Sequence, residues 1–157
     1  PDSAMVVPSL MAKMARGDNP VEVWGDGQDV RNFSYSGDVA QAIIDAIPNG
    51  NPERDIRGIE LKIGELVYIL SWLPYELELE QHPSRYGKGL SPDDVPRIHK
   101  DFLFTKPPKA IEMRLIGGDV YNRIKRQLLI TYRWFLGHPE EHKRKVNYFE
   151  SQSNKTP

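Results

Sequence analysis

Cysteine is absent from the 157-residue sequence, which excludes disulfide bonds, thiolate metal ligands and a cysteine nucleophile. An excess of charge of one sign is also absent, because 21 basic and 22 acidic residues leave a formal net charge of -1. A nearly neutral chain has no general electrostatic field that would draw it to nucleic acid or to an anionic membrane. No apolar run approaches the roughly 20 residues that a membrane-spanning helix requires. We therefore expect neither nucleic acid nor a membrane as a partner.

Two further absences concern targeting and cofactor binding. The opening Pro-Asp-Ser-Ala contains neither a start methionine nor a basic leader, so we expect no secretory signal. The absence of cysteine fits the cytoplasmic location that we expect. No Gly-x-Gly-x-x-Gly is present, because the two Gly-x-Gly pairs lead to Val30 and Pro92 in place of a third glycine. Without that loop the chain lacks a backbone cradle for a dinucleotide pyrophosphate. We expect no cofactor to bind to this chain alone.

The residues that are present predict helices alternating with strands within about one domain. Apolar side chains at helical spacing indicate the helices, and alternation of apolar with polar residues indicates the strands. Gly17 ends the first predicted helix, while Asp38 and Gln41 form a capping-box pattern that opens a helix closed by Pro48. The predicted helices are 8–16, 38–47, 63–70 and 124–136, with a short basic helix from 139, and the predicted strands are 21–24, 31–35 and 76–80. This order indicates a mixed α/β fold.

The most informative stretch is residues 23–40, which read Val-Trp-Gly-Asp-Gly-Gln-Asp-Val-Arg-Asn-Phe-Ser-Tyr-Ser-Gly-Asp-Val-Ala. It resembles a signature segment of the extended short-chain dehydrogenase/reductase family, the NAD-dependent nucleotide-sugar epimerases and dehydratases. In that family Trp-Gly-Asp-Gly is followed by Arg-Asp-Phe-Ile-Tyr-Val-Asp-Asp-Val-Ala. Three further segments are similar to family segments in the same order: 4–11, 61–67 and 131–149. The resemblance therefore covers most of the chain.

This run lies late in the family's enzymes, so the resemblance implies the C-terminal part of a Rossmann-type enzyme with its small substrate-binding domain. Residues 1–150 would form this sugar-nucleotide-binding part, with the last Rossmann strand near 56–61 and a disordered tail at 151–157. The implied partner is a nucleotide-diphosphate sugar. NAD or NADP is implied as the cofactor, held by a half that precedes this chain, and a homodimer is left open for the full-length protein. The parent reaction would oxidise a sugar hydroxyl by hydride transfer and then epimerise, eliminate or reduce. We expect this chain to supply pocket walls and no catalytic residue.

Arg31 is the first candidate for substrate binding, because the family's arginine at this place contacts the sugar-nucleotide diphosphate. A guanidinium presents a rigid fork of donors that suits a diphosphate. The alternative is a surface ion pair with Asp29 or Asp26. By the resemblance, Arg85 or Arg97 would close the clamp from the opposite side. The other candidates for the pocket walls, for which core packing is the favoured alternative, are Trp24, Tyr35, Leu10 and Met11.

Two local patterns suggest other chemistry. Tyr121 and Lys125 have the Tyr-x-x-x-Lys spacing of the family's catalytic pair, but they follow the Arg31 segment, so we interpret them as helix surface. Residues 138–142 fit the His-x-x-Glu-His pattern of zinc peptidases. His138 precedes the proline that begins a helix, and a third ligand is not evident, so we expect no metal.

The sequence also departs from the family. The Asn-x-Gly-Ser-Gly turn expected before the helix at residue 63 is absent, and Gly58 alone could be its remnant. Ser34, Ser36 and Gly37 stand where the family has Ile, Val and Asp. These departures keep a second hypothesis open, in which the chain is a diverged, non-catalytic remnant that acts as a binding or interaction module.

Overall fold

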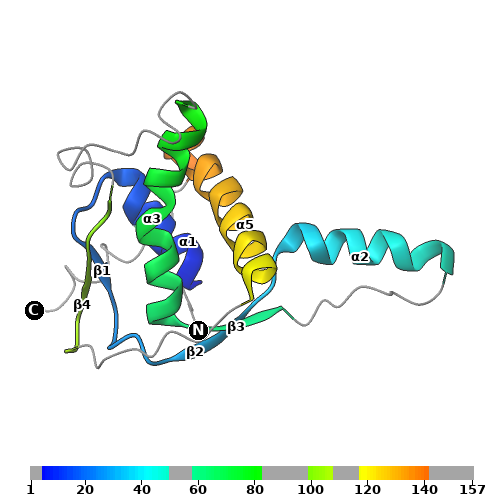
Figure 1. Cartoon of the computed structure of the whole chain (residues 1–157), viewed down its shortest axis with the longest axis horizontal. Helices are drawn as coiled ribbons and strands as arrows, with labels where there is room; N and C mark the ends of the chain where they lie inside the picture. The colour runs from blue at the N-terminus through cyan, green and yellow to red at the C-terminus, as the bar shows by residue number, and fades with distance from the viewer. Residues whose placement is uncertain (1–4, 50–57, 83–98, 108–116, 142–157) are drawn as a thin grey trace, which may run out of the picture.

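Helices and strands alternate along the computed structural model, which describes residues 5–49, 58–82, 99–107 and 117–141 (Figure 1). The described helices are α1 (Val6–Arg16), α2 (Ser36–Asn49), α3 (Ile63–Gln81) and α5 (Gly118–Gly137). The described strands are β1 (Val21–Val23), β2 (Val30–Phe33), β3 (Ile59–Lys62) and β4 (Phe102–Phe104). The mixed α/β class predicted from the sequence is confirmed.

The hydrophobic core forms where α5 packs against α1 and α3, with β1 packed on α1 (Figure 1). Met11, Leu70 and Leu73 have 0% of their surface exposed. Helix α3 is buried on most sides over its first turns, so its apolar residues do not form a single stripe. Helix α1 ends as predicted, because Gly17 adopts a left-handed conformation with φ 95° and its N–H bonds the carbonyls of Lys13 and Met14.

The described strands form two separate pairs. Strand β1 runs parallel to β4, with Val21 opposite Phe102 and Val23 opposite Phe104. Strand β2 runs antiparallel to β3, which lies close to the strand predicted near 56–61. The sequence did not predict β4, which has three residues between stretches rich in proline and charge. The β1–β4 pairing brings a distant part of the chain beside the residues that follow β1.

The strand predicted at residues 76–80 is wrong, because α3 continues through this segment to Gln81. The alternation of leucine and glutamate has a different cause. Glu76 Oε1 forms an ion pair with Lys125 Nζ at 3.2 Å, and Glu80 forms one with Arg133. Both carboxylates therefore contact cations of α5. Leu77 packs against the core beside them. Packing against α5 therefore favours the helix over the local pattern.

The capping role predicted for Asp38 is also wrong. Helix α2 begins at Ser36, and the N–H of Asp38 donates to the carbonyl of Tyr35 at 3.0 Å. The Asp38 carboxylate instead accepts a hydrogen bond from Gln127 of α5 at 2.7 Å. At the other end, Pro48 lies inside the helix, which continues to Asn49. Strand β2 ends before Tyr35, so that residue does not share a strand face with Arg31.

Helix α2 extends away from the packed helices (Figure 1). Ile43, Ile44 and Ile47 are 60%, 58% and 78% exposed, whereas Ala42 is 2% exposed. The helix predicted here is therefore present, but its large apolar side chains lie on the surface of the described structure. None of the helices in the described ranges is long and apolar enough to cross a membrane.

Gly58 has a conformation and an environment that exclude a side chain. Its φ is +75°, and an added Cβ would lie 2.3 Å from Asn32 Oδ1 and 2.5 Å from the Phe33 carbonyl oxygen. The positive φ alone costs an L-residue about 1–2 kcal/mol, and the overlap would also push β3 away from β2.

We expect Gly58→Ala to lower the free energy of unfolding, measured in urea, by more than the same change at Gly17. Gly17 is a matched control because its φ is +95° and nothing lies within 4 Å of an added Cβ. Equal losses in the two variants would show that the contact with Phe33 contributes nothing.

Candidate functional site

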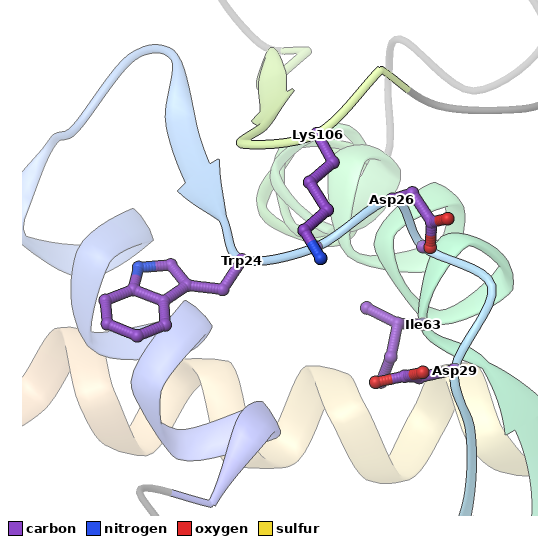
Figure 2. A pocket seen from close by; sticks show the side chains of 7 residues that line it. Trp24, Asp26, Asp29, Ile63 and Lys106 are labelled. Atoms are coloured by element: carbon purple, nitrogen blue, oxygen red, sulfur yellow. The ribbon is translucent and has the colours of Figure 1, made fainter.

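The candidate site is a cavity of about 200 Å³ beside the turn that follows β1. It is lined by Trp24, Gly25, Asp26, Gly27, Asp29, Ile63 and Lys106. These residues come from three parts of the chain: the turn after β1, the start of α3, and the segment after β4 (Figure 2). The cavity is therefore a tertiary feature, although most of its lining belongs to the best-matched sequence segment.

Backbone hydrogen bonds fix the turn against both neighbouring segments. The N–H of Gly25 donates to Thr105 Oγ1 at 2.8 Å, and the N–H of Lys106 donates to the Gly25 carbonyl at 3.0 Å. On the other side, the N–H of Gly64 donates to the Gly27 carbonyl at 2.9 Å. Gly25 and Gly27 have φ values of 93° and 81°, which only glycine adopts readily. The predicted Gly-Asp-Gly turn thus joins β4 to the start of α3.

Charged side chains approach the cavity from opposite sides. Figure 2 shows the Lys106 side chain extending into the space that Asp26, Asp29 and Ile63 border. The Asp26 carboxylate accepts a hydrogen bond from the N–H of Gln28 at 3.0 Å, which holds it in its own turn. Among the described residues, Lys106 has no ion-pair partner. The site therefore combines two carboxylates with one unpaired ammonium.

Trp24 lies at the edge of the cavity and not in the core. Its side chain is turned away from Lys106 towards α1 (Figure 2), and the residue is 82% exposed. The indole Nε1 donates to Glu22 Oε1 at 3.2 Å. Core packing, which the sequence favoured for Trp24, is therefore wrong. An indole face open to solvent can stack on a ring of a ligand.

Arg31 does not line the cavity but contacts a residue that does. Its Nη2 lies 3.5 Å from Asp29 Oδ2, and its side chain is 58% exposed. Its Nη1 also donates to the carbonyl of Val30 at 3.2 Å. The surface ion pair considered from the sequence is thus formed in this structure. Contact of Arg31 with a ligand stays a prediction.

The remaining predicted site residues lie elsewhere. Leu10 and Met11 are 4% and 0% exposed in the core, so they are packing residues and present almost no surface to a ligand. Tyr35 is half-buried after β2, with its ring over Gly37. Arg85 and Arg97 lie outside the described residues. Lys106 was missed, because a lone lysine after an unpredicted strand gives no signal in the sequence.

The first turns of α2, α3 and α5 do not suit a dinucleotide pyrophosphate. An anion of this kind is usually held by free N–H groups at a helix N-terminus. The first turns of α2, α3 and α5 instead contain Asp38, Glu65 and Asp119, whereas the first turn of α1 contains no acidic residue. Glu65 is fully buried and accepts the N–H of Lys62 at 2.7 Å, so it already occupies that end of α3. No step involving NAD or NADP can be derived from these residues.

Tyr121 and Lys125 are not arranged as an acid/base pair. The Lys125 ammonium lies 3.2 Å from Glu76, and its distance to the centre of the Tyr121 ring is 5.8 Å. Burial raises the pKa of Tyr121, whereas a tyrosine that acts as a base needs a lowered pKa. This pair is partly buried where α5 contacts α3, and not on an open helix surface as the sequence indicated.

The zinc-peptidase pattern begins beyond α5. The His138 ring stacks on Trp134, and its Nδ1 lies 2.8 Å from the Trp134 carbonyl oxygen. His142 lies outside the described residues. Within the part of the chain that the structure describes, no three side chains of metal-binding type are grouped.

Comparison with known proteins finds a family match that includes the turn after β1 but not Ile63 or Lys106. Residues 1–59 match the family model described as "NAD dependent epimerase/dehydratase family". A curated dTDP-4-dehydro-6-deoxy-D-allose reductase from Streptomyces bikiniensis is 29% identical over 85 residues, which cover 51% of this chain and 26% of that protein. A protein of the same name from Streptomyces sp is 32% identical over 85 residues, or 51% and 25% of the two chains. The chain thus spans about a quarter of the length of these relatives. No solved structure matches.

Proposed function

We propose, from the premise that this chain belongs to the NAD-dependent epimerase/dehydratase family, that it binds the sugar nucleotide in an NAD(P)-dependent enzyme. This family processes nucleotide sugars. The chain would supply walls of the substrate pocket, while a dinucleotide would need a glycine loop that this sequence lacks. Both relatives are named as reductases of a dTDP-linked deoxysugar, so a dTDP-sugar is the substrate class that we propose.

One observation carries this proposal. The cavity is built around the Trp-Gly-Asp-Gly turn, which lies inside the segment that matches the family. Its chemistry suits a nucleotide sugar, because carboxylates accept hydrogen bonds from hydroxyl groups and a lysine donates to a phosphate. A volume of about 200 Å³ is below the roughly 300–1,000 Å³ of pockets for drug-sized ligands. The cavity would therefore hold one part of the ligand, and the rest would extend past its rim.

Two rim residues then have proposed roles. Arg31 would exchange its ion pair with Asp29 for a contact to the diphosphate. Trp24 would stack its open indole face on a ring of the ligand. Leu10 and Met11 are left out of the pocket because both are buried in the core. Tyr35, Arg85 and Arg97 remain candidates for its other walls.

Titration of the ¹⁵N-labelled chain with dTDP-glucose tests this proposal through its three tryptophans. We expect the indole N–H signal of Trp24 to shift with saturation. Trp72 packs on Tyr75 and His99, and Trp134 packs on Phe135 and His138, so their signals are internal controls. NAD and NADP, added separately, should leave all three signals unchanged.

The result also tests sugar-nucleotide binding at this cavity against a remnant with another binding role. Saturable shifts confined to Trp24 would support sugar-nucleotide binding at this cavity. No shift of Trp24 at millimolar dTDP-glucose would count against the pocket and favour a remnant with another binding role. Shifts with NAD in the absence of any with dTDP-glucose would overturn the proposal.

A further inference from the structure

Lys106 stands out among the charged side chains around the cavity. Asp29 is paired with Arg31 at 3.5 Å, and Asp26 accepts the N–H of Gln28 at 3.0 Å. Lys106 has no ion-pair partner among the described residues, although its side chain extends into the cavity that both carboxylates line (Figure 2). Lys106 is exposed, so its ammonium is solvated and free to contact an anionic group of a ligand that enters the cavity.

Backbone hydrogen bonds fix the point from which the Lys106 side chain starts. Strand β4 continues the β1 pairing past Phe104, because Thr105 donates its N–H to the Val23 carbonyl at 2.9 Å and Lys106 donates to Gly25 at 3.0 Å. Nothing lies within 4 Å of a Cβ added to Gly25. A ligand can therefore approach the backbone of the turn at Gly25.

We infer that Lys106 contacts a phosphate of the bound sugar nucleotide and forms the cationic clamp together with Arg31. This inference rests on the proposed function, and it assigns to Lys106 the position that the resemblance gave to Arg85 or Arg97. Because an ammonium is a compact point charge, Lys106 does not require the geometry that a bidentate arginine contact requires. Contacts of this charge-assisted kind are the strong ones in anion recognition.

The two carboxylates limit which anions the clamp accepts. Lys106 and Arg31 carry two positive charges, and Asp26 and Asp29 carry two negative ones, so the site as a whole is nearly neutral. A bare phosphate would meet repulsion as well as attraction. A phosphate linked to a sugar would give Lys106 its anion and would also give the carboxylates hydroxyl donors. The site therefore favours a glycosyl phosphate group over inorganic phosphate.

Calorimetric titration of the 157-residue chain with dTDP-glucose, pyrophosphate and thymidine tests this inference. We expect Lys106→Gln to weaken dTDP-glucose binding roughly 10-fold or more, while Lys106→Arg retains most of the affinity. Pyrophosphate should bind more weakly than dTDP-glucose and should also lose affinity in Lys106→Gln. Any thymidine affinity should not change, because thymidine carries no phosphate.

Lys100→Gln is the matched control. Lys100 precedes β4 and its Nζ lies 3.5 Å from the Asp18 carbonyl oxygen, near the start of β1, while Lys106 lies beyond the end of β1. The control removes the same charge without touching the cavity, and we expect its affinities to equal those of the wild type. The Lys106 side chain is exposed, so neither Lys106→Gln nor Lys106→Arg should unfold the chain.

Each outcome tests either the role of Lys106 or the proposed function. Wild-type binding of dTDP-glucose with Lys106→Gln within twofold would overturn the role of Lys106 and leave the proposed function in place. No wild-type binding of dTDP-glucose would overturn both. Binding of pyrophosphate without dTDP-glucose would identify a free-phosphate site and overturn the sugar-nucleotide assignment. Equal losses of thymidine and dTDP-glucose would show a structural change and not a lost phosphate contact.

Discussion

Replacing Leu70 by alanine is expected to lower the free energy of unfolding by about 2–5 kcal/mol. Leu70 is 0% exposed and lies on α3 within the core cluster that α1 and α5 share. Alanine would remove buried methyl groups and leave a cavity that helices on several sides cannot easily close. At about 2–4 °C per kcal/mol for a chain of this size, the melting temperature should fall by roughly 4–20 °C.

The same change at Leu136 is the control, because this leucine of α5 is 41% exposed. Far-ultraviolet circular dichroism during heating and in urea would measure both variants. We expect Leu136→Ala to change stability by less than about 1 kcal/mol. A loss in Leu70→Ala no larger than in Leu136→Ala would show that α3 is not the centre of the core. It would also argue against α3 as the element that holds Ile63 in the cavity wall.

The sequence predicted the elements whose signals are local. Helix α1 combines apolar residues at helical spacing with a left-handed glycine at its end, and both features act within a few residues. Residues 76–80 were mispredicted because the interaction that decides them is distant. Lys125 and Arg133 of α5 pair with Glu76 and Glu80, and no pattern inside residues 76–80 contains that information.

The difference between local and distant interactions also explains which parts of the candidate site were predicted. The Gly-Asp-Gly turn was predicted from its glycines, and the structure gives both of them a positive φ. Trp24 was assigned to the core because large aromatic residues are usually buried, yet its exposure is decided by what packs beside the end of β1. Lys106 reaches the cavity through a strand pairing between positions about 80 residues apart, Val23 with Phe104. Neither fact could be read without the tertiary fold.

The surface of α2 shows a third limit of sequence reasoning. A helix was predicted over residues 38–47, and the structure exposes its apolar residues Ile43, Ile44 and Ile47. The spacing of apolar residues predicts that one face of a helix is apolar, but it does not predict which element packs on that face. The family match ends near this helix, at residue 59, and the chain spans about a quarter of the length of its curated relatives.

The ion pair between Arg31 and Asp29 does not prevent Arg31 from binding a ligand. Both side chains are largely exposed, at 58% and 75%, and the closest distance between them is 3.5 Å. An exposed pair of this kind contributes about 0–1 kcal/mol. A charge-assisted hydrogen bond to a phosphate contributes about 1.5–3 kcal/mol. The phosphate contact is the stronger of the two, so a bound diphosphate would displace Asp29 from the guanidinium.

Arg31→Ala is therefore expected to weaken sugar-nucleotide binding roughly 10- to 150-fold, measured by calorimetry with dTDP-glucose on the protein expressed from its natural gene. Arg31→Lys should recover part of the loss, because an ammonium keeps the charge but not the fork of donors. Affinity for NAD or NADP should hardly change in either variant. Arg16→Ala is the matched control, since it breaks another Arg–Asp surface pair, with Asp18 at 2.6 Å, at the far end of β1. If Arg31→Ala bound dTDP-glucose within twofold of the wild type, as the control should, then Arg31 would be a surface ion-pair residue and the diphosphate would have to be held by other groups.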